Sequence, residues 1–236
     1  WKNYLKIGKS GIIGGAGLGI AMISFIYSIT NTTAAITLLC LAAMPFFTAL
    51  LAFIFLKEHI SINVWISIII ATIGIIIMAF GNSGENSLVG FIFGLTSSIG
   101  FSVFSVTLRW RKETPKFTTV AFAGLFCFIF ATIMILSKGQ VFFSSSYNSS
   151  LFSLHGTLVC FGLILYSIGS KAIPAAELTL LSLTEVIGGI FWVWLPLFGI
   201  NEVPDTNTII GGFFLFMSLF YYSLIMRWNK RYIGLN

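Results

Sequence analysis

Long apolar runs constrain this sequence more than any other feature. Each run is long enough for a helix that crosses a bilayer, which takes roughly 20 mostly apolar residues. Short polar connections separate the runs, and within them apolar and polar residues do not alternate as they would in half-buried strands. We therefore predict an all-α polytopic membrane protein with eight spanning helices, at 10–30, 32–56, 61–81, 88–110, 117–138, 151–172, 175–199 and 205–228.

The composition agrees with a membrane environment. Only 8% of the residues are charged and 57% are hydrophobic, whereas a soluble domain carries about 25% charged residues. So few charges cannot cover a surface that faces water, and the expected surroundings are a lipid bilayer. Basic residues outnumber acidic ones by 13 to 7, but they lie between the apolar runs and form no stripe that would bind nucleic acid. We expect no nucleic-acid partner.

The positions of the basic residues predict an orientation. Successive connections alternate between the two sides of the membrane, and cytoplasmic connections carry an excess of Lys and Arg. If both chain ends lie on one side, the other side carries only Lys138. We therefore predict that both ends are cytoplasmic, in a bacterial inner membrane. The cytoplasmic side would carry Lys2, Lys6, Lys9, Lys57, Arg109, Arg111, Lys112, Lys116, Lys171, Arg227, Lys230 and Arg231.

No motif in the sequence indicates a cofactor. Cys40, Cys127 and Cys160 lie within apolar runs, without the spacing of a metal site or of a disulfide framework. The glycines between Gly11 and Gly19 resemble a phosphate-binding loop, but the Lys-Ser/Thr pair that such a loop requires does not follow them. We therefore expect no metal, no nucleotide and no other cofactor. The glycines are better explained by close packing of membrane helices.

An internal repeat connects two distant parts of the chain. Ala35–Leu41 resembles Glu177–Leu183, and each segment leads about 20 residues later to a glutamate, Glu58 or Glu202. By the count of crossings, the first copy enters the membrane from outside and the second from the cytoplasm. Repeats of opposite topology are typical of carriers that work by alternating access. We expect the two glutamates to mark helix ends, in a capping or gating role.

The segments that carry this repeat resemble the EamA-type domain of the drug/metabolite transporter superfamily. The resemblance lies in residues 33–58 and 172–204 and is clearest in Leu180–Val186. The sequence departs from the family pattern at Val186, where the family has a proline, and about three extra residues precede Glu202. The resemblance implies two inverted repeats of five helices each, ten helices in all.

The resemblance also implies a domain division. The eight predicted helices correspond to helices three to ten of the family. Residues 1–84 then form the first repeat with three helices, and residues 85–236 form the second repeat with five. Because the chain begins at Trp1 rather than Met, we expect the first two helices to precede this sequence.

Glu185 is the strongest candidate for a binding residue. It lies near the middle of the run 175–199, and hence near the middle of the bilayer. A carboxylate there costs about 2.5–3.5 kcal/mol on insertion scales, so it must face a cavity, a partner or a proton. Its predicted role is to bind the solute or a coupling proton. The alternative is a protonated, hydrogen-bonded side chain that fixes helix packing.

Other polar and aromatic residues within the runs are candidates for the same site. Ser98 and Ser102 lie one turn apart on one helix face, and Pro45 predicts a kink within the run 32–56. That kink either shapes the binding site or serves packing alone. The remaining candidates for binding the solute or a proton are Tyr27, Tyr166, Ser182 and Trp192.

Together these features predict a secondary-active carrier of small organic solutes. The expected solutes are amino acids or related metabolites, carried by alternating access in the direction of export. One alternative is a membrane-embedded enzyme, although His59 and His155 are predicted on opposite faces of the membrane. The other alternative is a membrane fragment that does not transport. We expect no enzymatic activity, and the sequence does not indicate an oligomeric state.

Overall fold

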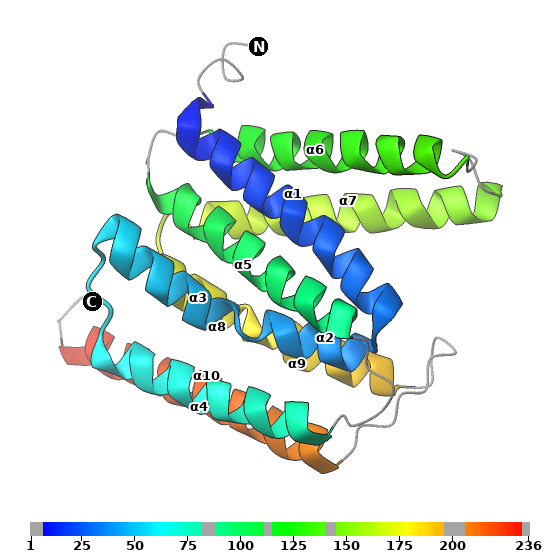
Figure 1. Ribbon diagram of the computed structural model, residues 1–236. Coiled ribbons are helices and arrows are strands. Elements are labelled where there is room, and N and C mark those ends of the chain that lie inside the picture. Colours follow the sequence, from blue (N-terminus) through cyan, green and yellow to red (C-terminus); the bar gives the residue numbers. More distant parts are fainter. Residues whose placement is uncertain (1–6, 82–87, 111–114, 140–144, 196–205, 233–236) are drawn as a thin grey trace.

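A computed structural model describes residues 7–81, 88–110, 115–139, 145–195 and 206–232. Every regular element in these ranges is a helix (Figure 1), which confirms the predicted all-α fold. The elements are α1 (Gly8–Asn31), α2 (Ala34–Leu41), α3 (Met44–Leu51), η1 (Ala52–Leu56), α4 (Ile62–Gly81), α5 (Leu88–Trp110), α6 (Lys116–Ser137), α7 (Ser146–Gly169), α8 (Ala175–Leu181), α9 (Leu183–Trp194) and α10 (Thr206–Tyr232).

Six helical segments within these ranges are long and apolar enough to cross a membrane. Two of them, Ile36–Leu56 and Ala175–Trp192, combine consecutive helices. Shorter apolar stretches occur in α4 and α10, at Ile62–Ile77 and Ile209–Ile225. The eight predicted runs therefore correspond to α1, α2 to η1, α4, α5, α6, α7, α8 to α9, and α10.

Two of the predicted helices are broken in the middle. The run 32–56 is interrupted at Ala42 and Ala43, and Pro45 is the second residue of the new helix α3. Proline has no N–H to donate but suits the first turn of a helix, where no N–H has a partner within the helix. A new helix that starts just before Pro45 therefore loses fewer backbone hydrogen bonds than a kinked continuous helix would. The run 175–199 is interrupted at Ser182. Its predicted end, like Glu202, lies outside the described residues.

The start of α7 also differs from the prediction. This helix begins at Ser146, five residues before the predicted start at residue 151. Ser145 caps it by accepting a hydrogen bond from the backbone N–H of Asn148. Serine is favoured at this position because its side chain satisfies a free N–H of the first turn. The Ser/Asn-rich stretch therefore begins a helix as well as connecting two.

The broken helices run antiparallel to each other. Helix α3 packs against α8, and α2 packs against α9. The helices that follow them, α4 and α10, also pack side by side (Figure 1). The end of the bundle that holds Lys9, Lys57, Arg109 and Lys171 is here called the basic end.

Helices α1 and α5 form a close contact through glycines. A Cβ atom on Gly100 would lie 2.6 Å from the carbonyl oxygen of Gly17 and 3.0 Å from the backbone nitrogen of Ala21. Small residues let two helix backbones approach this closely in membranes. Hydrogen bonds add to the contact, because Ser97 of α5 donates to the Ala21 carbonyl at 2.8 Å.

The π-helical segment η1 ends in an unusual backbone conformation. Lys57 has a φ of 53°, in the left-handed region, which costs a non-glycine residue about 1–2 kcal/mol. Glycine adopts this conformation without that cost. We therefore expect Lys57→Gly to raise the free energy of unfolding by about 0.5–1 kcal/mol. A thermal melt in detergent would measure this change, and a lower melting temperature would contradict it.

Candidate functional site

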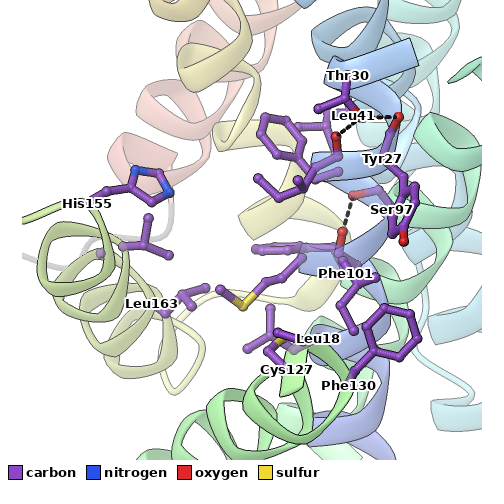
Figure 2. A pocket seen from close by; sticks show the side chains of 18 of the residues that line it. Leu18, Tyr27, Thr30, Leu41, Ser97, Phe101, Cys127, Phe130, His155 and Leu163 are labelled. Atoms are coloured by element: carbon purple, nitrogen blue, oxygen red, sulfur yellow. Dashed lines mark hydrogen bonds between the residues drawn. The ribbon is translucent and has the colours of Figure 1, made fainter. Parts of the chain in front are cut away.

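A cavity of about 1200 Å³ lies between α1, α6 and α7, and α5 and α9 contribute to its inner end. Figure 2 shows His155 and Leu163 of α7 on one side, and Tyr27 and Phe101 of α1 and α5 on the other. Most of the side chains in its wall are apolar or aromatic. Pockets for small organic ligands occupy about 300–1,000 Å³ and have a similar lining. The cavity is therefore large enough for one small organic molecule.

The cavity reaches from the middle of α1 and α6, and from the last turn of α7, towards the end opposite the basic end. Its innermost lining residues on the three long helices are Leu18 of α1, Cys127 of α6 and Tyr166 of α7. Thr30 and Lys138, near the far ends of α1 and α6, line its outer part. On these three helices, no described residue nearer the basic end lines the cavity. The cavity is thus placed to be reached from one end of the bundle.

Glu185 lies at the inner end of this cavity because the helix break brings it there. Helix α9 starts directly after the break at Ser182, and Glu185 lies in its first turn. The start of a helix favours a carboxylate because its free N–H groups and dipole are positive. Glu185 lines the cavity and interacts electrostatically with Tyr166. Among the described lining residues it is the one carboxyl group, so it is the one acidic group that this part of the cavity offers to a solute or a proton.

The two candidate tyrosines also line the cavity. The Tyr166 hydroxyl lies 2.7 Å from the Ser105 hydroxyl, and Ser182 is also part of its electrostatic environment. The Tyr27 hydroxyl donates to the sulfur of Met134 at 3.6 Å, which connects α1 to α6. The structure therefore brings Glu185, Tyr166 and Ser182 together at the inner end, whereas Tyr27 lies further out.

The two candidate serines of α5 have a different position. Both are fully buried and are not among the described residues that line the cavity. Ser98 donates a hydrogen bond to the carbonyl of Cys40, and Ser102 donates to the carbonyl of Met44 at 3.2 Å. These carbonyls flank the break between α2 and α3, where helical hydrogen bonds are lost. The serine face of α5 therefore hydrogen-bonds to the backbone on both sides of the break and holds α5 against α2 and α3.

Trp192 lies on the surface of α9. Its side chain is 55% exposed, and it is not among the described residues that line the cavity. The sequence did not predict that an aromatic wall, which includes Phe101 and Phe130, lines the cavity, or that Lys138 and His155 lie in its outer part. An apolar residue in an apolar run carries no signal that separates cavity from lipid. Within the described ranges, no cluster of His, Cys, Asp and Glu could hold a metal ion.

Comparisons with known proteins connect this fold to transporters. The model of the EamA-like transporter family matches residues 1–80. An uncharacterized transporter of Bacillus subtilis (strain 168), YdfC, is 24% identical over 203 residues, which cover 83% of this chain and 65% of that protein. An uncharacterized transporter of Helicobacter pylori (strain J99) is 30% identical over 95 residues, or 40% of this chain and 32% of that one.

The chain spans less than two thirds of the length of these two relatives. A solved structure, described only as the crystal structure of a protein, matches with a TM-score of 0.70 and 16% identity. The match covers 92% of this chain and 76% of that one, and at this identity it shows a shared fold alone. The family match over residues 1–80, the transporter relatives and the all-helical fold confirm the resemblance found in the sequence, and this chain is similar to EamA-like transporters.

Proposed function

We propose that this protein carries small organic solutes across a membrane by alternating access. The observation that carries the proposal is the cavity, which reaches the middle of an apolar helical bundle and ends at the carboxylate of Glu185. Ionisable side chains are rare within membrane-spanning segments because they are costly to bury there. Those that occur mark substrate or proton pathways. A solute that reached this carboxylate from one end would be half-way across the bundle.

The antiparallel pair of broken helices supports the mechanism. In carriers with inverted repeats, discontinuous helices meet near the bilayer midplane, and their free ends face the substrate. The breaks before α3 and before α9 fit this pattern, because α2 packs against α9 and α3 against α8. We assign residues 1–84 to the first repeat and residues 85–236 to the second. By analogy with the family, they form eight helices of a ten-helix carrier.

The proposed orientation places the basic end in the cytoplasm of a bacterium, as the excess of Lys and Arg predicts. The cavity then opens to the outside of the inner membrane. The expected solutes are amino acids or related metabolites, carried in the direction of export. Glu185 would bind a basic group of the solute or a coupling proton, and the aromatic wall would contact the apolar part. Differential binding in the two states would drive the cycle.

A pair of glycines on α7 tests whether the cavity is the transport path. A Cβ atom on Gly162 or on Gly156 would meet no other atom within 4 Å, but only Gly162 is among the residues that line the cavity. We expect Gly162→Trp to place an indole ring inside the cavity and to lower transport by at least about fivefold, because a bulky ring on the wall obstructs the path of a ligand.

The measurement is exchange of radiolabelled amino acids and amines by the full-length protein in proteoliposomes. Gly156→Trp is the matched control, since it adds the same ring to the same helix outside the cavity. Exchange that is unchanged in Gly162→Trp would contradict transport through this cavity. The absence of exchange of every solute in the unchanged protein would contradict the proposed function.

A further inference from the structure

An ion pair joins three segments of the chain at the basic end. The Nε of Arg109, in the last turn of α5, lies 3.0 Å from Oε1 of Glu58, which follows η1. The Nη1 of the same side chain donates to the carbonyl oxygens of Ser170 and Ile173, at 3.5 and 3.3 Å. Both carbonyls belong to the connection from α7 to α8. One guanidinium group therefore ties this connection and the end of η1 to α5.

This contact lies close to the inner end of the cavity. Tyr166 lines the cavity, and Ser170, four residues later, accepts a hydrogen bond from Arg109. Four residues of helix span about 6 Å. Towards the opposite end, α6 and α7 diverge from α1 and α5 (Figure 1), and the outer part of α7 is exposed over most of its length. The bundle is thus open at one end and joined by polar contacts at the other.

The segment that carries Glu58 departs from regular helical geometry. Residues 52–56 form a π-helix, and Lys57 has a left-handed conformation. The backbone N–H of Glu58 donates to the carbonyl of Ala52 at 3.3 Å, which closes the wide turn. Single π-helical turns occur frequently at functional sites. Residues in sparsely populated backbone conformations cluster at switch regions, so this segment is suited to a change in position.

The charge environment makes Glu58 the specific partner of Arg109. The two side chains are 26% and 23% exposed, so water screens their attraction only in part. Lys57 and Lys171 lie nearby in the chain, but both are exposed. Glu177, also near this end, accepts a hydrogen bond from the Tyr222 hydroxyl at 2.6 Å instead.

We propose that the Glu58–Arg109 ion pair is the latch of a gate at the basic end. In the present state it holds the η1 segment and the α7–α8 connection against α5, which closes the path from the cavity to that end. In the opposite state the pair separates, the α7–α8 connection moves away from α5, and the cavity opens to the basic end. This inference rests on the proposed alternating access. It adds a residue pair, outside the binding cavity, that sets the balance between the two states.

The test uses a reporter cysteine at the inner end of the cavity. The full-length protein would carry Leu18→Cys, with its native cysteines replaced by serine, and would be labelled in membrane vesicles with a membrane-impermeant maleimide. A second version carries Lys9→Cys instead, at an exposed position of the basic end. Its labelling measures the fraction of the protein whose basic end faces the reagent. The rate of labelling at position 18 from that side then measures how often the gate is open.

We expect Glu58→Gln and Arg109→Gln each to raise this rate by about three- to tenfold. The pair is partly exposed, so the effect of losing it should lie between that of an exposed ion pair and that of a buried one. Arg109→Lys, which keeps a positive charge near Glu58, should raise it less. Lys171→Gln removes a charge from the same connection without touching the pair, and should leave the rate unchanged. Because two different residues are tested, misfolding of one variant still leaves the other informative.

An unchanged labelling rate in both neutralised variants would overturn the latch. An equal increase in Lys171→Gln would also overturn it, because loss of any basic charge at this end would then suffice. Labelling does not depend on which solute is carried. A raised labelling rate in variants of a protein that exchanges no solute would therefore contradict the proposed function but not the gate. Solute exchange together with an unchanged labelling rate would contradict the gate alone.

Discussion

Replacing Glu185 with Gln is expected to lower solute transport by about 10- to 100-fold while the protein still folds. Glu185 is the one carboxylate among the described residues that line the cavity. A hydrogen bond to a charged group contributes about 1.5–3 kcal/mol, and each 1.4 kcal/mol is a tenfold change. The amide of Gln keeps the size of the side chain but can neither carry a negative charge nor take up a proton. The measurement is the initial rate of transport in proteoliposomes across a range of pH.

The pH profile separates the two proposed roles of Glu185. If the carboxylate binds a basic group of the solute, Glu185→Gln should weaken both net transport and solute exchange. If it binds a coupling proton, net transport should lose its pH dependence while exchange continues. Glu177→Gln is the matched control, because Glu177 precedes the same break but bonds to Tyr222. Unchanged transport and an unchanged pH profile in Glu185→Gln would remove Glu185 from the mechanism.

Gly100→Ala is expected to be among the most damaging single changes to the fold. The added Cβ would lie 2.6 Å from the carbonyl oxygen of Gly17, and backbone cannot rotate away as a side chain can. Helix α1 would have to move away from α5, which would weaken the bond from Ser97 to Ala21 and the packing of Leu18 in its cluster. Overpacking of this kind costs about 1–3 kcal/mol.

The measurement is the melting temperature in detergent, together with the amount of folded protein in the membrane. Gly124→Ala on α6 is the control, because a Cβ there would meet no atom within 4 Å. Alanine favours a helix over glycine by about 1 kcal/mol, so this control should be neutral or slightly stabilising. Equal melting temperatures for the two variants would contradict a tight contact between α1 and α5.

The serines of α5 show where sequence reasoning reached its limit. Their spacing predicted a shared helix face that could line the solute site, but a polar face can point into a cavity or towards the backbone of a neighbouring helix. Ser98 and Ser102 face the break between α2 and α3. That break depends on how Pro45 is accommodated, and its effect on another helix is a property of packing. Glu185 was easier to identify, because a lone carboxylate in an apolar run needs an explanation wherever it packs.

The sequence by itself determined that the chain is a bundle of apolar helices, and roughly where each helix lies. These properties follow from local composition, because a bilayer requires long apolar helices whatever their neighbours are. Only the tertiary structure decided which residues face the cavity, that Glu185 and Tyr166 meet at its inner end, and that Arg109 pairs with Glu58. Lipid and a protein interior are both apolar, so hydrophobicity does not tell a membrane helix which of its faces is buried. Packing between distant segments makes that choice.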